Sequence, residues 1–237
     1  MTQSFSRPRA GAPSAATATD TNRTRALLAC GVAAGPLFIV VALLQVLTRD
    51  GFDLSRHPLS LLSLGDLGWI QIGNFVVTGL LAVAFAVGLR RVLHPGRGGT
   101  WGPLLLGAFG VGLIAGGVFV PDPALGFPPG APSGIPDQFS WHALLHAIAP
   151  PLAFSSLIVA CFVVARRFAG LRQRGWAAYC AATGLAVLAL SAWPDVDVVS
   201  VVLAAAAALG LGWVSVLAAR LLTELADQSG GSRARIR

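Results

Sequence analysis

The chain has 237 residues, of which 55% are hydrophobic and 11% are charged, and its mean hydropathy is +0.72. A soluble domain carries about a quarter charged residues, so this chain cannot cover its surface with polar groups, and an ordinary soluble protein is excluded. The net charge of +7 comes from 17 arginines that stand in short clusters beside apolar runs, a placement typical of membrane topology and not of a nucleic-acid-binding patch.

Long apolar runs predict an all-α polytopic integral membrane protein, built as one bundle of six transmembrane helices in contact with the lipid bilayer. The expected spans cover residues 26–47, 69–90, 102–120, 141–165, 176–193 and 198–222. Residues 1–25 are rich in Ala, Thr, Ser, Pro and Arg without hydrophobic periodicity, and they predict a disordered cytoplasmic tail. Residues 223–237 predict a basic cytoplasmic tail.

The first span is about 22 residues long, enough to cross roughly 30 Å of hydrocarbon. Gly31 and Gly35 are four residues apart, which lets a neighbouring helix approach closely, and Pro36 predicts a kink. The following outer loop is too apolar to be free in water. Pro58 and Gly65 bracket a leucine-rich stretch there, and they predict a short interfacial or re-entrant helix.

Polar residues gather at the expected outer ends of the next spans. Gln71, Asn74 and Thr78 form one stripe that descends along the second span from the outer surface. The third span is rich in glycine, including Gly112 and Gly116, and a helix with so little side chain predicts a central position among close neighbours.

Two independent signals set the orientation. Fifteen of the 17 arginines fall in segments on one side of the six spans, against Arg49 and Arg56 on the other. The positive-inside rule therefore predicts that both termini are cytoplasmic and that the protein lies in the inner (plasma) membrane. Tryptophans at the span ends, such as Trp69 and Trp141, agree with an aromatic belt.

The outer side carries the candidate site. Eight residues are expected to line one outward-facing polar pocket: Asp53, Arg56, His57, Gln71, Asn74, Asp122, His142 and His146. His142 and His146 share one helical face, and with Asp122 they offer ligands for a divalent metal. Position 143 is Ala and not Glu, so the arrangement is not that of a metalloprotease. Haem is disfavoured because two histidines one turn apart cannot bind both faces of one haem.

A Ser-His-Asp hydrolase site can be assembled from Ser60, Ser63 or Ser140 with these residues, but no nucleophile-elbow pattern supports it. No acid or base lies in the middle of any expected span, which argues against proton pumps and ion-coupled carriers.

Several short motifs carry a family resemblance: Arg56-His57-Pro58-Leu59-Ser60, Gly68-Trp69-Ile70-Gln71 with Asn74-Phe75, Pro121-Asp122-Pro123, Phe127-Pro128-Pro129-Gly130, and Trp141-His142 with Leu144-Leu145-His146. Through them, residues 26–222 resemble the bacterial domain-of-unknown-function family 998. The resemblance implies a six-span inner-membrane protein and assigns no catalytic role to any residue.

Three functional hypotheses remain open. The first is a pocket that binds a small molecule or a lipid. The second is a membrane-embedded enzyme, such as a metal-dependent lipid hydrolase that uses Asp122, His142 and His146. The third is a structural or partner-binding subunit. The sequence indicates no nucleic-acid partner and leaves the oligomeric state open.

Overall fold

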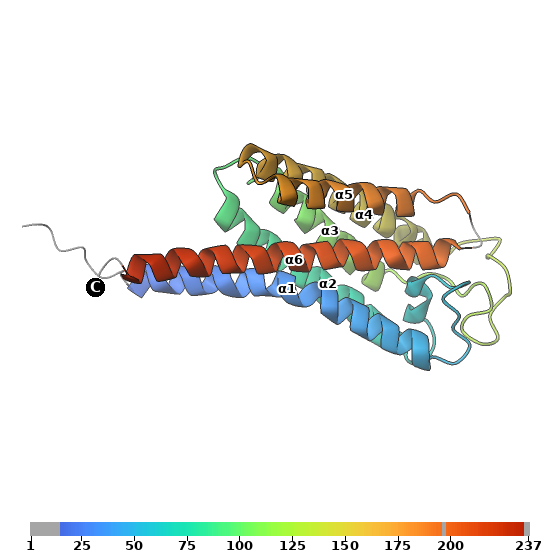
Figure 1. Ribbon diagram of the computed structural model, residues 1–237. Helices are drawn as coiled ribbons and strands as arrows, with labels where there is room; N and C mark the ends of the chain where they lie inside the picture. Colours follow the sequence, from blue (N-terminus) through green and yellow to red (C-terminus); the bar gives the residue numbers. More distant parts are fainter. Residues whose placement is uncertain (1–14, 196–197, 235–237) are drawn as a thin grey trace, which may run out of the picture.

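The computed structural model describes residues 15–195 and 198–234, and within these residues the chain is all-helical, without a β-strand (Figure 1). One short 3-10 helix, η1, precedes the second long helix. The elements are α1 (Ala15–Thr48), η1 (Leu59–Ser63), α2 (Gly68–Leu93), α3 (Trp101–Val118), α4 (Trp141–Gly170), α5 (Arg174–Ser191) and α6 (Val199–Ala234).

The helices form a closed ring. Each long helix packs against the helix before and the helix after it in the chain, and α6 closes the ring against α1. The prediction that the third span is central is therefore wrong, because α3 packs between α2 and α4. Its glycines serve pairwise contacts instead. A Cβ on Gly110 would lie 2.7 Å from the Gly79 carbonyl oxygen of α2, so these two backbones touch.

The contact between α1 and α6 depends on the small residues of the first span. A Cβ on Gly31 would lie 2.8 Å from Ala218 Cβ, and one on Gly35 would lie 2.7 Å from Leu211 O, which confirms the predicted close approach. Ser215 of α6 inserts into this turn of α1. Its hydroxyl accepts from Gly35 N at 3.1 Å and donates to the Gly31 carbonyl oxygen at 3.1 Å.

Pro36 lies directly after this inserted serine. Proline lacks an N–H and cannot complete the helical hydrogen bond to residue 32, so a bend is expected at this point. In Figure 1, α1 runs alongside α6 over its first half and then bends away from it toward the loops at the η1 end of the ring, which was expected on the outer side and is called the outer end below. The ring is therefore tight at one end and wider at the other.

Hydrogen bonds tie the segments together at both ends of the ring. Ser200 at the start of α6 donates to the Arg56 carbonyl oxygen in the α1–α2 loop at 3.2 Å. At the opposite end, Arg220 of α6 donates to Gln173 beside α5 at 2.9 Å, and its guanidinium stacks 4.4 Å from the Trp176 ring. The helix α6 is thus bonded to other segments at both of its ends.

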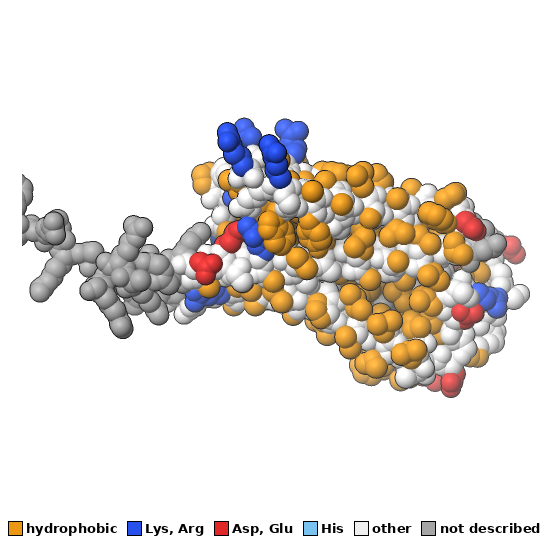
Figure 2. All heavy atoms as spheres, in the orientation of Figure 1, with side chains coloured by type: hydrophobic (Ala, Val, Ile, Leu, Met, Phe, Trp, Pro, Cys, Tyr) orange, Lys and Arg blue, Asp and Glu red, His pale blue; other side chains and the backbone are white. Residues whose placement is uncertain are grey.

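The outer surface of the ring is apolar. Trp69, Trp101 and Trp141 are each about two-thirds exposed, and Figure 2 shows hydrophobic side chains along the length of the visible face, with arginines mostly at one end and carboxylates mainly at the other. Five helices in the described residues, α1, α2, α3, α4 and α6, are long and apolar enough to cross a membrane. The chain is therefore a multi-pass helical membrane protein.

The helix α5 is not among those five. It has 18 residues, and its first turn holds Arg174 and Gly175, which lower its hydropathy. It nevertheless packs between α4 and α6 and contributes to the core. Trp213 of α6 is fully buried and donates from Nε1 to Cys180 Sγ of α5 at 3.3 Å. Six spans were predicted. The ring contains six long helices, and five of them are long and apolar enough to cross a membrane.

The first helix begins earlier than expected. Residues 15–25 were expected in the disordered tail, but α1 starts at Ala15. A helix nucleated within the apolar span can extend toward its N-terminus without a second nucleation cost. Asp20 supports the extension, because its carboxylate lies 3.6 Å from Arg91 of α2 and its carbonyl accepts from Thr24. Residues 1–14 of that tail lie outside the described residues. At the other terminus, α6 continues through most of the predicted tail to Ala234.

Candidate functional site

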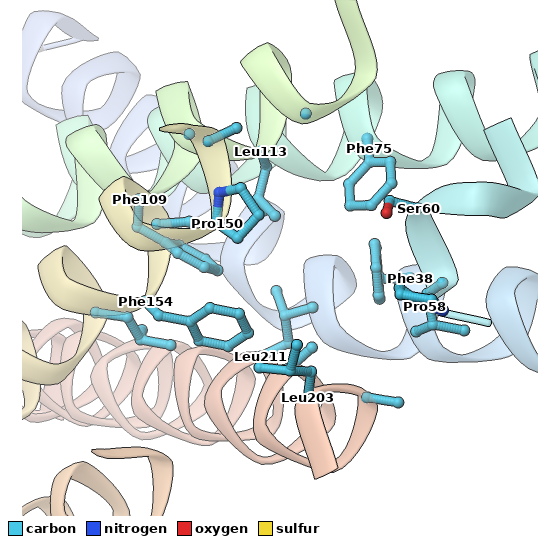
Figure 3. Close-up of a pocket in the computed structure, with 18 of the residues that line it drawn as sticks. Phe38, Pro58, Ser60, Phe75, Phe109, Leu113, Pro150, Phe154, Leu203 and Leu211 are labelled. Carbon is cyan, nitrogen blue, oxygen red and sulfur yellow. The ribbon is translucent and has the colours of Figure 1, made fainter. Parts of the chain in front are cut away.

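An apolar cavity of about 150 Å³ lies inside the ring, in its wider half. Every long helix except α5 contributes to its wall, and η1 lies at its outer end (Figure 3). The wall is formed by Phe38, Pro58, Leu59, Ser60, Phe75, Phe109, Gly112, Leu113, Gly116, His146, Ala149, Pro150, Ala153, Phe154, Leu157, Ser200, Leu203, Ala204, Ala207 and Leu211. No acidic residue, arginine or lysine is among these residues.

Two proline-containing helices shape this space. Phe38 stands two residues after the Pro36 bend of α1, and its ring packs 5.4 Å from the Phe75 ring of α2. On the other side, Pro150 and Pro151 interrupt the hydrogen bonding of α4. Pro150 lines the cavity, which is not fully enclosed.

His146 is the largest polar side chain in the wall. It is 8% exposed, and its Nδ1 lies 2.6 Å from the Phe119 carbonyl oxygen. A carbonyl oxygen accepts only, so Nδ1 carries the proton, and in the neutral ring Nε2 is left as an acceptor. Ser60 and Ser200 add hydroxyl groups near the outer end. The sequence predicted a polar pocket, whereas this cavity is apolar with three polar side chains.

Asp122 and His142 meet through Ser140, at the outer ends of α3 and α4. Ser140 is the N-cap of α4 and accepts from Ala143 N at 3.2 Å. Its backbone N and its hydroxyl both donate to the Asp122 carboxylate, at 2.7 and 2.5 Å. These two hydrogen bonds, the hydroxyl bond foremost, hold the pKa of Asp122 below its usual value. His142 Nδ1 lies 2.9 Å from Ser140 Oγ and 3.3 Å from the Val120 carbonyl oxygen.

This arrangement differs from a catalytic triad. A triad places the imidazole between the serine and the carboxylate, so that the imidazole removes the serine proton. Here Ser140 stands between Asp122 and His142, and the carboxylate accepts its hydroxyl proton. The cluster therefore caps α4 and ties it to the end of α3. Within the described residues, no group of three His, Cys, Asp or Glu side chains could hold a metal ion, so the predicted ligands Asp122, His142 and His146 do not form such a group.

The outer loops clasp one another through His57. This ring is 3% exposed, accepts from Asp53 N at Nδ1 (2.9 Å), and donates from Nε2 to the Leu125 carbonyl oxygen at 3.0 Å. It also packs between Phe52 and Phe127, with ring centroids 5.3 and 5.5 Å away. His57 therefore fastens the α1–α2 loop to the α3–α4 loop and does not face the cavity.

Asp53 and Arg56 lie beside this clasp on the exposed surface. Ser55 donates to the Asp53 carboxylate from its hydroxyl at 2.7 Å and from its backbone N at 2.9 Å, and these bonds lower the pKa of Asp53. The Arg56 side chain reaches toward Leu125 O at 3.5 Å. Asp53 therefore stabilises the turn at Ser55, and Arg56 contacts the α3–α4 loop.

A second polar cluster is buried between α1 and α2. Gln71 Oε1 accepts from Gln45 Nε2 at 2.8 Å and from Asn74 Nδ2 at 3.3 Å, and Asn74 Nδ2 also donates to the Phe38 carbonyl oxygen at 3.1 Å. These three side chains are at most 4% exposed. One polar atom of each, and the buried Thr78 hydroxyl, have no hydrogen-bond partner within the described residues. The predicted stripe is buried, and two of its members, Gln71 and Asn74, form hydrogen bonds to α1.

Of the eight predicted residues, His146 is the one in the cavity wall. Asp122 and His142 were predicted to line the same pocket as His146, but neither is in the cavity wall, and both side chains bond to Ser140 instead. The sequence reasoning missed the aromatic wall formed by Phe38, Phe75, Phe109 and Phe154, because such residues read alike whether they face lipid or a cavity. It also missed Gln45, whose amide in the last turns of an apolar span was an available signal.

The chain was compared with curated proteins, solved structures and protein families. No curated protein and no solved structure matches the chain. One family model, described as "Protein of unknown function (DUF998)", matches residues 32–220, which spans all six long helices of the ring. The motifs at 56–60, 121–123 and 141–146 lie within the matched range, and they form the loop clasp and the capped start of α4. The chain belongs to the DUF998 family.

Proposed function

We propose that this protein is a six-span protein of the bacterial inner membrane, with both termini in the cytoplasm, that binds one uncharged hydrophobic ligand in the cavity of its helix ring. The ligand class is a neutral lipid, or a small apolar molecule of similar shape. The observation that carries the proposal is the apolar cavity of about 150 Å³, which is lined by five long helices and is not fully enclosed.

The topology rests on the length and placement of α5. Its 18 residues span about 27 Å at 1.5 Å per residue, close to the thickness of the hydrocarbon core. Leu185 and Leu188 are exposed on its outer face, as side chains that contact lipid would be. The arginine-rich end of the ring is assigned to the cytoplasm by the positive-inside rule.

Reporter fusions test this topology. A compartment-sensitive reporter placed in the 121–140 loop and another placed after residue 234 are expected to give opposite results, with the second in the cytoplasm. The same compartment for both reporters would contradict the six-span arrangement.

The ligand class follows from the lining. A charged head group in this wall would lose its hydration with no ionic partner, which costs several kcal/mol in an apolar environment. An apolar cavity of roughly 150 Å³ can hold a benzene-sized molecule, and so a ring or a short stretch of acyl chain. Lipid tails are as apolar as leucine, so moving an acyl chain from the bilayer into the cavity removes no apolar surface from water. The favourable binding free energy therefore comes from dispersion contacts with a wall that fits the shape of the ligand.

His146 can orient the ligand through a hydrogen bond. The neutral imidazole of His146 has one acceptor nitrogen, which can accept a hydrogen bond from a hydroxyl group of the ligand, worth about 0.5–1.5 kcal/mol net. A diacylglycerol, with one hydroxyl and two acyl chains, has this combination. We therefore place the ligand hydroxyl near His146 and one chain among Phe109, Phe154 and Leu211.

Photocrosslinking tests the proposal. The purified protein is reconstituted with a diacylglycerol that carries a diazirine in one acyl chain, and the crosslinked peptides are mapped. We expect labelling of cavity residues in α3, α4 and α6. Ala207→Phe, which fills the cavity from α6, should remove this labelling, and Ala205→Phe, on the exposed face of the same helix, should keep it. Equal labelling of both variants would contradict binding in the cavity.

A further inference from the structure

A second hollow lies at the arginine-rich end of the ring, far from the outer loops and distinct from the cavity. It is an open groove of about 620 Å³ between the α2–α3 loop with the start of α3 and the end of α4. Its walls are Arg97, Gly98, Trp101, Val163, Arg166, Arg167, Ala169 and Gly170. Three arginines from two different segments therefore converge on one groove.

The arginines of this groove have no carboxylate partner among the described residues. The two ion pairs among the described residues are Arg91–Asp20 and Arg220–Glu224, so no carboxylate pairs with Arg97, Arg166 or Arg167 there. The other polar contacts of the groove are to backbone. Arg167 donates to the Arg97 carbonyl oxygen at 2.8 Å and reaches the Leu93 carbonyl oxygen at 3.5 Å. It holds the loop in place, while Arg97 and Arg166 remain exposed.

The other walls of the groove are apolar and face outward. Trp101 is 67% exposed, and Leu104, one turn further along α3, is 57% exposed. Val163 lies opposite them on α4. Trp101 stands at the first residue of α3, where a tryptophan marks the boundary between head groups and hydrocarbon. The groove thus has cations at the depth of lipid phosphates and apolar side chains at the depth of acyl chains.

We propose that this groove binds an anionic phospholipid from the leaflet at this end of the ring, the inner leaflet in the proposed topology. Arg97 and Arg166 contact the phosphate, and the acyl chains follow Trp101, Val163 and Leu104. Basic pockets between transmembrane helices on the cytoplasmic side are recognised sites for anionic head groups. Topology alone requires arginines at this end, but not their convergence on a groove with an apolar wall. The proposal does not depend on the ligand of the cavity.

Native mass spectrometry of the full-length protein, titrated with phosphatidylglycerol or phosphatidylcholine, tests this site. Each arginine near an anionic surface contributes about fivefold in affinity, so removal of two should weaken phosphatidylglycerol binding about 25-fold. The test variant is Arg97→Gln with Arg166→Gln. The control is Arg172→Gln with Arg174→Gln, which removes the same charge from exposed positions at the same end.

We expect the wild-type protein and the control to bind phosphatidylglycerol in preference to phosphatidylcholine, and the test variant to lose that preference. Inorganic phosphate at millimolar concentration should not displace the lipid, because the apolar wall contributes to binding. Equal losses in the test and control variants would overturn the proposal in favour of general charge attraction. No lipid preference in the wild-type protein, or displacement by inorganic phosphate, would overturn it as well. A Tm in detergent equal to that of the wild-type protein serves as the check that the test variant folds.

Discussion

Replacement of Gly112 by alanine should loosen the ring, whereas the same change at Gly116, one turn away, should not. A Cβ on Gly112 would lie 2.9 Å from Ala153 Cβ, 3.0 Å from Ala153 N and 3.1 Å from Ala153 Cα. These atoms belong to the body of α4 and not to a flexible side chain, so α3 and α4 must separate. Overpacking of this kind costs about 1–3 kcal/mol.

Gly116 provides the matched control. A Cβ there would lie 3.8 Å from Ala149 Cβ and 4.0 Å from Phe75 Cδ1, which are ordinary contacts at the edge of the cavity. Removal of a glycine from a helix interior gains up to about 1 kcal/mol. A larger side chain at Gly116 also has the cavity to enter.

Thermal unfolding in detergent, followed by intrinsic tryptophan fluorescence, measures the difference. For a chain of this size, 1 kcal/mol shifts Tm by about 2–4 °C, so Gly112→Ala should lower Tm by about 2–12 °C. Gly116→Ala should leave Tm unchanged or raise it by a few degrees. Equal Tm values for the two variants would refute the contact geometry between α3 and α4.

Three further changes probe the polar clusters. Gln71→Leu removes the acceptor shared by Gln45 and Asn74, and it should destabilise the protein by about 1–3 kcal/mol in the same assay, because buried amide hydrogens lose their partner. Thr78→Val removes a buried hydroxyl that has no partner within the described residues, so it should leave Tm unchanged or raised; a marked loss would show that the hydroxyl is bonded. Asp122→Asn should lower Tm at pH 7. The folded pKa of Asp122 is lowered, so its contribution is present above the usual carboxyl pKa of about 4 and is lost as pH falls through the folded value. The Tm difference between wild type and Asp122→Asn should therefore shrink toward zero below about pH 4, and a difference independent of pH would contradict the hydrogen-bonded carboxylate.

The sequence predicts the helices of this protein well, because an apolar run long enough to cross a membrane has few alternative structures. It also predicts the bend at Pro36 and the small-residue contact at Gly31 and Gly35, because both depend on local backbone chemistry. The order of helices around the ring is not encoded in any one segment. Glycine-rich α3 was expected at the centre of the bundle because small residues allow close contact with many neighbouring helices. In the structure, α3 packs closely against two helices, α2 and α4.

The candidate site was harder to predict for a physical reason. Polar residues stand out in an apolar sequence, so His57, Asp122 and His142 drew attention, yet their side chains are used to join loops and cap α4. The cavity is built from phenylalanine, leucine, alanine and glycine, which look the same in sequence when they face lipid. Nothing in the pattern separates Phe109, which lines the cavity, from an aromatic side chain in the aromatic belt.

The most direct test of the central claim is native mass spectrometry of the protein extracted with its native lipids. The wild-type protein and Ala205→Phe should each carry one tightly bound, uncharged hydrophobic molecule that survives removal of bulk lipid. Ala207→Phe, with the cavity filled, should carry none while it retains the Tm of a folded ring. An empty wild-type protein, or the same bound mass on Ala207→Phe, would contradict a ligand-binding cavity inside the ring.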